Sequence, residues 1–314
     1  MAHYLVTGGA GFIGSHLVEA LLARGDRVRV LDNLSTGTRD NVPSTCELRV
    51  GDIRDFTAVA EAMAGVDGCF HLAAAASVEL SNRDWLGTHA VNLTGTIHLF
   101  EAARRRGMEG RGAVPVVYAS SAAVYGDAPH GPLRETETPH PLTAYGADKL
   151  GCELHARVAG RVHGVPTLGC RFFNVHGPRQ DPASPYSGVI SIFMKRAREG
   201  RELRIFGDGQ QVRDFVYVGD VVAHLLRGME RVNPRGEAIN VCTGVPTTIL
   251  QLAQTILDLW GGRSEIAFLP PREGDIRLSL GDPGRSREVL GLEAKTTLVE
   301  GLAILKKNYE VPGV

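Results

Sequence analysis

Three glycines at three-residue spacing separate an apolar run from a helical segment near the start of this 314-residue chain. The apolar run at 3–7 predicts a short buried strand, and the periodicity of 12–24 predicts a helix. Gly8, Gly11 and Gly14 allow a tight turn and let backbone N–H groups approach a phosphate at the helix N-terminus. Taken alone, the turn fits an ordinary βα connection equally well, but its place between a strand and a helix favours a dinucleotide-binding unit.

The next strand pattern ends in an acidic residue, which strengthens the dinucleotide interpretation. Residues 27–31 predict a strand that runs directly into Asp32, 18 residues after Gly14. A carboxylate at this point accepts hydrogen bonds from ribose hydroxyls and repels a 2′-phosphate. The arginines within this strand are not placed to bind such a phosphate, so we expect NAD rather than NADP.

Strand and helix patterns alternate through the first half of the chain. This alternation predicts an α/β fold with a doubly wound, Rossmann-like parallel sheet that is covered by helices on both faces. The expected strands are 3–7, 27–32, 46–50, 67–72, 114–119 and 165–171, and the expected helices are 12–24, 55–64, 88–106 and 143–163.

After about residue 174 the pattern changes to loops rich in glycine, proline and arginine, separated by shorter elements. We therefore expect residues 1–174 to form the NAD-binding domain with the catalytic groups, and residues 175–314 to form predominantly a smaller substrate-binding lobe. The elements expected in this lobe are helices at 189–199, 219–230 and 248–259 and strands at 203–206, 213–217 and 238–241.

Composition excludes several classes of function. The chain carries 34 Lys and Arg against 35 Asp and Glu, so no net field attracts nucleic acid or an anionic membrane. It shows neither a leader peptide nor an apolar window of transmembrane length. Five scattered cysteines without a CxxC pair, and eleven histidines without ligand spacing, predict reduced thiols and no metal site. We expect a soluble cytoplasmic protein.

Two segments carry candidate catalytic groups. Residues 116–119 predict an apolar strand followed by Ser120 and Ser121, and ligands of such sheets bind at the carboxyl ends of the strands. Tyr145 and Lys149 are four residues apart on an expected helix, so both lie on one face. A neighbouring ammonium favours the phenolate form of a tyrosine, which then acts as a general base. Taken alone, such a pair is more often an ordinary surface contact.

Further motifs follow in a fixed order along the chain. They are GDIRD at 51–55, HLAA at 71–74, Asn92, YASSAAVYG at 118–126, RFFNVHGPRQDP at 171–182, FGDGQQVRDFVYVGD at 206–220 and PREGD at 271–275. With the features above, they make the chain resemble the extended short-chain dehydrogenase/reductases, in their UDP-sugar 4-epimerase branch. The individual motifs are weak, but their ordered combination is specific and covers essentially the whole chain. The resemblance implies NAD as cofactor, a UDP-sugar as substrate and a homodimer.

The resemblance also implies which residues hold the cofactor. The glycine turn meets the pyrophosphate, Asp32 and its neighbour meet the adenosine ribose, and later residues meet the adenine or line the path to the nicotinamide. The implied cofactor-binding residues are Gly8, Gly11, Phe12, Ile13, Asp32, Asn33, Ser35, Thr36, Gly37, Asp52, Ile53, Leu72, Ala73, Ala74, Asn92, Tyr145, Lys149 and Phe172.

For the substrate, the resemblance implies that Arg213 and Arg272 neutralise the diphosphate and that Asp275 accepts hydrogen bonds from the uridine ribose. It also implies that the uracil and its ribose are enclosed by Val189, Arg204 and Phe206. The implied substrate-binding residues are Ser121, Tyr145, Asn174, Val189, Arg204, Phe206, Arg213, Arg272, Asp275 and Ser279. The implied catalytic residues are Ser121, Tyr145 and Lys149. In this branch the tyrosine takes the proton of the sugar 4-hydroxyl while hydride passes to NAD. The keto sugar then turns over, and hydride returns to its opposite face.

The residues after Ser121 distinguish this branch from its neighbours. Sugar 4,6-dehydratases carry an acid pair there and UDP-glucuronate decarboxylases carry a glutamate, whereas this chain has Ala122 and Ala123. We therefore expect a 4-epimerase. The alternatives are a UDP-glucuronate 4-epimerase, another nucleotide-sugar-modifying member of the family, and a non-catalytic NAD-binding redox sensor. Such sensors typically lose the serine or the Tyr/Lys pair, and this chain keeps both.

Two finer expectations follow from the resemblance. Ser279, four residues after Asp275, stands where a tyrosine restricts the pocket and a small residue admits an N-acetyl group. UDP-GlcNAc and UDP-GalNAc are therefore expected beside UDP-glucose and UDP-galactose. Uronate-specific relatives carry an arginine where this chain has Asp181, so UDP-glucuronate ranks last.

The dimer is expected to pair the helices at 88–106 and 143–163. Its expected apolar contacts are Ile97, Leu99, Phe100, Leu150 and Leu154.

Overall fold

Seven parallel strands form the central sheet of the structure, a computed structural model that describes residues 1–181, 188–272 and 274–310. Their order across the sheet is β11-β6-β5-β4-β1-β2-β3. The strands are β1 (His3–Thr7), β2 (Arg27–Asp32), β3 (Glu47–Val50), β4 (Gly68–His71), β5 (Val116–Ser121), β6 (Thr167–Phe172) and β11 (Glu237–Val241). The two halves of the sheet grow outward from β1 and β4, which confirms the expected Rossmann-like fold. Pro182 and Glu273, which belong to two of the motifs, lie outside the described residues.

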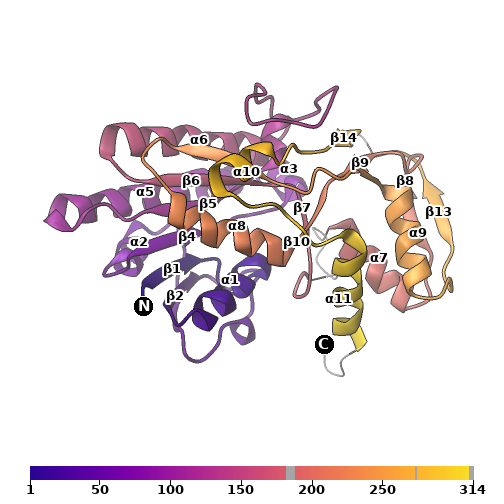
Figure 1. Cartoon of the computed structure of the whole chain (residues 1–314), viewed down its shortest axis with the longest axis horizontal. Coiled ribbons are helices and arrows are strands. Elements are labelled where there is room, and N and C mark those ends of the chain that lie inside the picture. The colour runs from indigo at the N-terminus through magenta and orange to yellow at the C-terminus, as the bar shows by residue number, and fades with distance from the viewer. Residues whose placement is uncertain (182–187, 273, 311–314) are drawn as a thin grey trace.

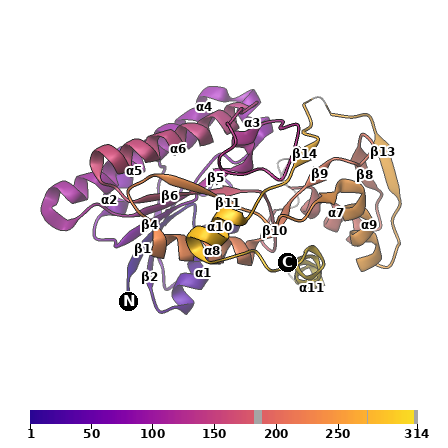
Figure 2. The same ribbon diagram turned by 45° about the horizontal axis from the view of Figure 1, so that its top comes forward.

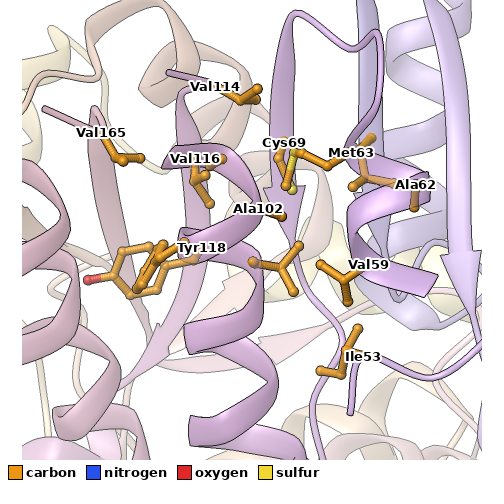
Figure 3. Close-up of a cluster of buried hydrophobic side chains, with 14 of the residues drawn as sticks. Ile53, Val59, Ala62, Met63, Cys69, Ala102, Val114, Val116, Tyr118 and Val165 are labelled. Atoms are coloured by element: carbon orange, nitrogen blue, oxygen red, sulfur yellow. The ribbon is translucent and has the colours of Figure 1, made fainter. Parts of the chain in front are cut away.

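Helices cover both faces of this sheet (Figure 1). One face carries α2 (Phe56–Met63), α5 (Gly95–Arg106) and α6 (Ala144–His163), and the other carries α1 (Phe12–Ala23), α8 (Val218–Arg231) and α10 (Gly284–Leu290). Figure 3 shows part of the core on the first face, which contains Val59, Met63, Val116 and Tyr118. Each helix thus buries one apolar stripe against the sheet, as layered α/β packing requires. No helix of the described ranges is long and apolar enough to cross a membrane.

The long helix expected at 88–106 is interrupted in the structure. It consists of α4 (Trp85–His89), a π-helical turn at Ala90–Thr94 and α5, and the short helix α3 (Val78–Arg83) precedes it. The π-turn carries Asn92, whose side chain is buried. Turns of this kind are frequent at functional sites because they re-aim a side chain without ending the helix.

The C-terminal elements build a second, smaller part of the molecule at the carboxyl side of the sheet (Figure 2). Its elements are α7 (Val189–Arg198), β8 (Leu203–Phe206), β9 (Val212–Arg213), β12 (Thr247–Thr248), α9 (Ile249–Leu259), β13 (Ile266–Leu269), β14 (Leu278–Ser279) and α11 (Leu298–Glu310). Met194, Ile205, Leu252 and Leu302 belong to its core. Two short parallel strands, β7 (Asn174–His176) and β10 (Phe215–Tyr217), pair beside this part.

One expectation for the C-terminal half is wrong. The strand expected at 238–241 within the lobe is β11, which pairs in parallel with β6 at the edge of the central sheet. Its Ile239 and Val241 are fully buried, so apolar burial holds the strand in this sheet. The helix α8, which we also expected in the lobe, packs on the same sheet. The chain therefore crosses between the two parts of the molecule more than once.

The single strand expected at 213–217 is also wrong, because Asp214 divides it into β9 and β10. The Asp214 side chain is fully buried. Its carboxylate accepts hydrogen bonds from the backbone N–H groups of Thr243, Gly244 and Gly281. A buried carboxylate requires such partners, so the chain turns inward at this residue and does not continue as one strand.

Candidate active site

The glycine turn after β1 leaves no space for side chains. Gly8 has a φ of +70°, and a Cβ added there would lie 2.6 Å from the Ala73 nitrogen. A Cβ at Gly14 would overlap the carbonyl oxygen of Gly8. Helix α1 begins after Gly11 with no side-chain cap and no acidic residue in its first turn. Its first N–H groups are therefore available to an anion, which fits the pyrophosphate of a dinucleotide.

Asp32 lies beside this turn at the carboxyl end of β2. Its Oδ2 accepts a hydrogen bond from the Ala10 N–H at 2.9 Å, and its Oδ1 accepts one from the Leu34 N–H at 2.8 Å. These two bonds fix the carboxylate and leave lone pairs on both oxygens for ribose hydroxyls. Together, the capless helix and this carboxylate fit the NAD cofactor expected from the sequence.

The residues expected around the adenosine lie in two neighbouring loops. The Asn33 amide nitrogen donates to Asp52 at 3.0 Å, and the Asn33 Oδ1 accepts from the Ser35 N–H at 3.1 Å. Hydrogen bonds from Arg54 hold the pKa of the Asp52 carboxyl at about 2. The side chain of Ile53, in contrast, is buried in the core. This burial leaves the Ile53 side chain little surface for an adenine ring.

Thr36 and Gly37 follow in the same loop as Ser35. Gly37 packs closely on Ala10, because an added Cβ would lie 2.6 Å from the Ala10 carbonyl carbon. The exposed Thr36 therefore stays close to the glycine turn. The structure thus brings the loop expected on the adenosine side against the turn expected on the pyrophosphate.

Asn92 holds the segment that follows β4. Its Oδ1 accepts from the Ala75 N–H at 2.8 Å, and its Nδ2 donates to the Ala75 carbonyl at 3.2 Å. Leu72, Ala73 and Ala74, which were expected along the cofactor path, lie directly before this contact and follow β4. A side chain that satisfies both backbone groups of one residue fixes the course of the loop.

His71 of the HLAA motif supports the same segment from beneath. Burial lowers its pKa to about 3, so the ring is neutral. Thr96 donates its hydroxyl proton to the Asn92 carbonyl at 2.5 Å, and its oxygen therefore accepts from His71 Nε2 at 2.9 Å. Nδ1 then accepts from the Thr7 hydroxyl at 2.7 Å, whose oxygen accepts from the Ala73 N–H at 3.3 Å. Donor and acceptor are therefore consistent in all four of these hydrogen bonds. The sequence alone did not reveal this network.

Ser121, Tyr145 and Lys149 meet at the carboxyl end of β5. The Lys149 Nζ donates to the Ala119 carbonyl at 2.8 Å and lies 5.8 Å from the centre of the Tyr145 ring. The Ser121 Oγ accepts from the Ala123 N–H at 3.1 Å, which leaves its own proton free to donate. Lys149 is almost fully buried. Tyr145 and Lys149 are therefore not the ordinary surface pair that their spacing also allowed.

Two local features bring α6 to this position. Thr143 caps the helix by accepting a hydrogen bond from the Gly146 N–H at 3.1 Å. A Cβ at Gly146 would lie 2.6 Å from the Ala123 carbonyl oxygen, so the glycine lets the first turn pack on the residues after Ser121. Phe172 lies opposite Ser121 in the β5–β6 register, so it joins the same end of the sheet.

The substrate-side residues gather on short strands. Arg213 on β9 pairs in register with Ser279 on β14, and its Nη2 contacts the Asp275 Oδ1 at 2.7 Å. The Asn174 N–H donates to the Asp214 carbonyl at 2.9 Å, which ties β7 to the loop between β9 and β10. These contacts bring four of the expected substrate residues toward one region.

The residues expected around the uracil and its ribose, Val189, Arg204 and Phe206, have different surroundings. The Phe206 ring lies 3.8 Å from the guanidinium carbon of Arg272, one of the arginines expected on the diphosphate. Arg204 shares one face of β8 with Phe206 but is exposed and paired with Glu202 at 2.6 Å. Val189 begins α7 and packs against the core of the smaller part of the molecule.

Gln211 contacts two of the residues expected to bind the substrate, although the sequence alone did not single it out. Its Nε2 donates to the Phe206 carbonyl at 2.8 Å and to the Asp275 Oδ2 at 3.0 Å. Its position inside the FGDGQQVRD motif is the signal that could have identified it.

No group of residues suited to holding a metal ion occurs within the described part of the chain.

Comparison with known proteins places these features among sugar-nucleotide enzymes. The profile of the NAD dependent epimerase/dehydratase family matches residues 4–242. A UDP-glucose 4-epimerase of Mycolicibacterium smegmatis is 40% identical over 308 residues, covering 95% of this chain and 96% of that protein. UDP-glucose 4-epimerase of Thermotoga maritima with UDP-glucose has a TM-score of 0.93 at 37% identity, covering 98% of both chains. UDP-N-acetylglucosamine 4-epimerase from Methanobrevibacter ruminantium, in complex with UDP-N-acetylmuramic acid, has a TM-score of 0.91 at 33% identity and the same coverage.

Proposed function

Since this chain belongs to the NAD-dependent epimerase/dehydratase family, we propose that it is a UDP-sugar 4-epimerase. The observation that carries the proposal is the arrangement at the end of β5. At this end of the strand lie a tyrosine, a buried lysine and a serine with a free hydroxyl proton. The two residues after the serine, Ala122 and Ala123, carry no carboxylate. Epimerisation needs no further acid, whereas dehydration and decarboxylation do.

NAD is the cofactor of this family, and when bound it accepts the C4 hydride of the sugar and later returns it. The residues of this chain move the proton. The Tyr145 phenolate removes the proton of the 4-hydroxyl and gives it back after the keto sugar has turned over. Ser121 donates its free proton in a hydrogen bond to the 4-oxygen. Lys149, oriented by the Ala119 carbonyl, holds its amino group 5.8 Å from the centre of the Tyr145 ring.

We propose UDP-GlcNAc and UDP-GalNAc as substrates, together with UDP-glucose and UDP-galactose. Ser279 supports this proposal, because it lies opposite Arg213, the expected diphosphate ligand, and carries a small side chain. The test is to incubate the purified protein with UDP-GlcNAc, UDP-galactose and UDP-glucuronate separately and to follow the formation of each 4-epimer. Conversion of none of the three sugars would contradict the proposed function.

The pocket argument predicts the effect of one substitution. Ser279→Tyr should lower kcat/KM for UDP-GlcNAc by about 10- to 100-fold, because a ring replaces the space left for the N-acetyl group. UDP-glucose turnover should change by less than about threefold, within the usual scatter for an uninvolved contact. Ser279→Ala, which keeps the space, serves as the control and should retain both substrates. Equal loss of both substrates in Ser279→Tyr would refute a pocket at this position.

We also propose a homodimer through α5 and α6. Leu154, Val158 and Val162 recur every four residues along α6 and are 51%, 48% and 68% exposed, which leaves one apolar stripe uncovered. Of the contacts expected from the sequence, Leu99 and Phe100 are buried in the core and are not available to a partner. The exposed stripe takes their place in the proposal.

Val158→Asp tests the dimer. A charge in the middle of a buried apolar interface is costly, so light scattering at micromolar concentration should give twice the chain mass for the unchanged protein and the chain mass for the variant. Val299→Asp, at a valine on α11 that is 60% exposed against 48% for Val158, is the matched control and should remain dimeric. If Val158→Asp remained dimeric, the interface could not lie at this stripe.

We further propose that the protein works in the cytoplasm without nucleic-acid or membrane partners. All five cysteines are unpaired, and four of them are buried, which suits a reducing compartment. The near balance of acidic and basic residues supports the absence of polyanionic partners.

A further inference from the structure

Gln211 links the two groups expected to bind the nucleoside half of the substrate. Its side-chain nitrogen donates both to the carbonyl of Phe206, at the end of β8, and to the carboxylate of Asp275. Phe206 is the aromatic residue expected near the uracil, and Asp275 is the carboxylate expected on the uridine ribose. One amide group therefore sets the spacing between a base-binding and a ribose-binding residue.

The orientation of this amide is determined by chemistry. If the Gln211 amide were turned over, its oxygen would face a carbonyl and a carboxylate, which are both acceptors. In the observed orientation the Oε1 is buried without a hydrogen-bond partner. An unsatisfied buried acceptor costs free energy, and such local costs concentrate at functional sites. The glutamine therefore does more than fill space in the loop.

The loop around Gln211 is itself held in place. The first N–H groups of α9 donate to its backbone, Ile249 to the Gln211 carbonyl at 3.1 Å and Leu250 to the Gly209 carbonyl at 2.9 Å. The Asp275 carboxylate, in contrast, belongs to an irregular connection between β13 and β14. Its Oδ1 is bound by Arg213 and its Oδ2 by Gln211. A loop that is bonded to the start of α9 thus contacts a carboxylate that lies outside regular structure.

We infer that Gln211 is a positioning residue that orients the Asp275 carboxylate toward the ribose hydroxyls and thereby makes the site prefer a ribonucleotide. This inference rests on the proposed UDP-sugar function. The carboxylate uses one lone pair of each oxygen on Arg213 and Gln211, which leaves the others for two hydroxyl donors. Without Gln211, the carboxylate can rotate about its remaining bond to Arg213, and its fit to the ribose is lost.

The test compares UDP with 2′,3′-dideoxy-UDP, which lacks both ribose hydroxyls. Calorimetry should give tighter binding of UDP by the unchanged protein. In Gln211→Met, which has similar length but no donor, the ratio of the two dissociation constants should fall by about tenfold, the value of one hydrogen bond to a charged group. In Gln211→Glu the fall should be at least as large, because a second carboxylate repels Asp275. KM should rise with the same factor while kcat and the content of bound NAD stay constant.

Gln210 offers a matched control, because it is the exposed neighbour in the same loop. Gln210→Met and Gln210→Glu should leave the ratio, KM and melting temperature unchanged. A ratio unchanged in both Gln211 variants would overturn the inference, and so would equal weakening of both nucleotides, since that is the effect of a merely structural role. Failure of the unchanged protein to bind UDP would overturn the proposed function and this inference with it.

Discussion

Tyr145→Phe should reduce kcat by about 10³- to 10⁴-fold with every epimerisable substrate, because it removes the only group assigned to the 4-hydroxyl proton. The substitution deletes a single oxygen. The phenyl ring keeps its place beside Lys149, whose Nζ remains bonded to the Ala119 carbonyl. The melting temperature and the amount of NAD released on denaturation should therefore match those of the unchanged protein. Ser121→Ala should cost less, about 10²-fold, because the phenolate still moves the proton.

The partial reaction provides a second measurement. Reduction of bound NAD by the sugar requires loss of the 4-hydroxyl proton, so the NADH absorbance that substrate produces should appear much more slowly in Tyr145→Phe. Tyr309→Phe is the matched control, since Tyr309 lies on α11 against Arg198 and away from β5. It should turn over normally. Near-normal turnover in Tyr145→Phe would show that another group carries the proton.

The elements of the first half can be predicted because their signals are local. The strands expected at 3–7 and 27–32 have these bounds in the structure, and the first helix differs by one residue. In each case a run of apolar residues is followed by a glycine turn or a charged residue, and nothing outside the segment is needed to interpret it. The sequence did not predict the π-turn that interrupts the helix expected at 88–106, because such a turn changes the backbone hydrogen bonding but not the apolar periodicity.

The strand pairing of the C-terminal half depends on contacts between residues that are far apart in the sequence. Strand β11 joins the sheet beside β6, about 70 residues earlier in the chain, and its apolar pattern fits either part of the molecule equally well. The strands β9, β12 and β14 have two residues each, which is too short for any alternation to show. Their pairing places Ser279 opposite Arg213, so the geometry of the substrate side could only be inferred from resemblance.

The proposed catalytic residues were named from the resemblance, whereas the buried polar groups near them were not. The resemblance assigns Ser121, Tyr145 and Lys149, and the structure brings all three to one end of β5. Our reasoning from the sequence did not interpret Glu153 or Arg171, although a charged residue within an otherwise apolar strand is itself a signal. Such residues need partners, and the partners are distant in sequence.

Arg171 and Glu153 form a buried ion pair near the carboxyl end of β5. Their side chains are 2% and 1% exposed and join through two hydrogen bonds of 2.8 and 2.7 Å. Ser120 donates to the same carboxylate at 2.6 Å. Arg171 also donates to the Tyr125 hydroxyl at 2.8 Å, which donates to Asn240 on β11 at 2.7 Å. The pair therefore connects α6 and β5 to β6 and, through Tyr125, to the edge strand β11.

Arg171→Met should be the most destabilising of the substitutions considered. It removes the cation and leaves the buried Glu153 carboxylate with the Ser120 hydrogen bond but no opposite charge, and breaking a buried pair typically costs about 3–5 kcal/mol. For a protein of this size we expect the melting temperature to fall by about 5–8 °C. Bound NAD and turnover should be lost at a lower temperature than in the unchanged protein, because β5 and α6 carry the residues that we propose as catalytic. Differential scanning calorimetry with the cofactor present measures the shift.

The double variant Arg171→Met/Glu153→Leu separates an unpaired charge from lost packing. If the cost arises from the buried carboxylate, removing that charge should recover much of the melting temperature, since apolar replacements of buried pairs are often tolerated. Arg277→Met is the matched control, because its partner Asp208 is exposed and solvent screens that pair. It should leave the melting temperature nearly unchanged. If the double variant were less stable than Arg171→Met alone, the destabilisation would come from lost shape and hydrogen bonds to Ser120 and Tyr125, and not from the orphaned charge.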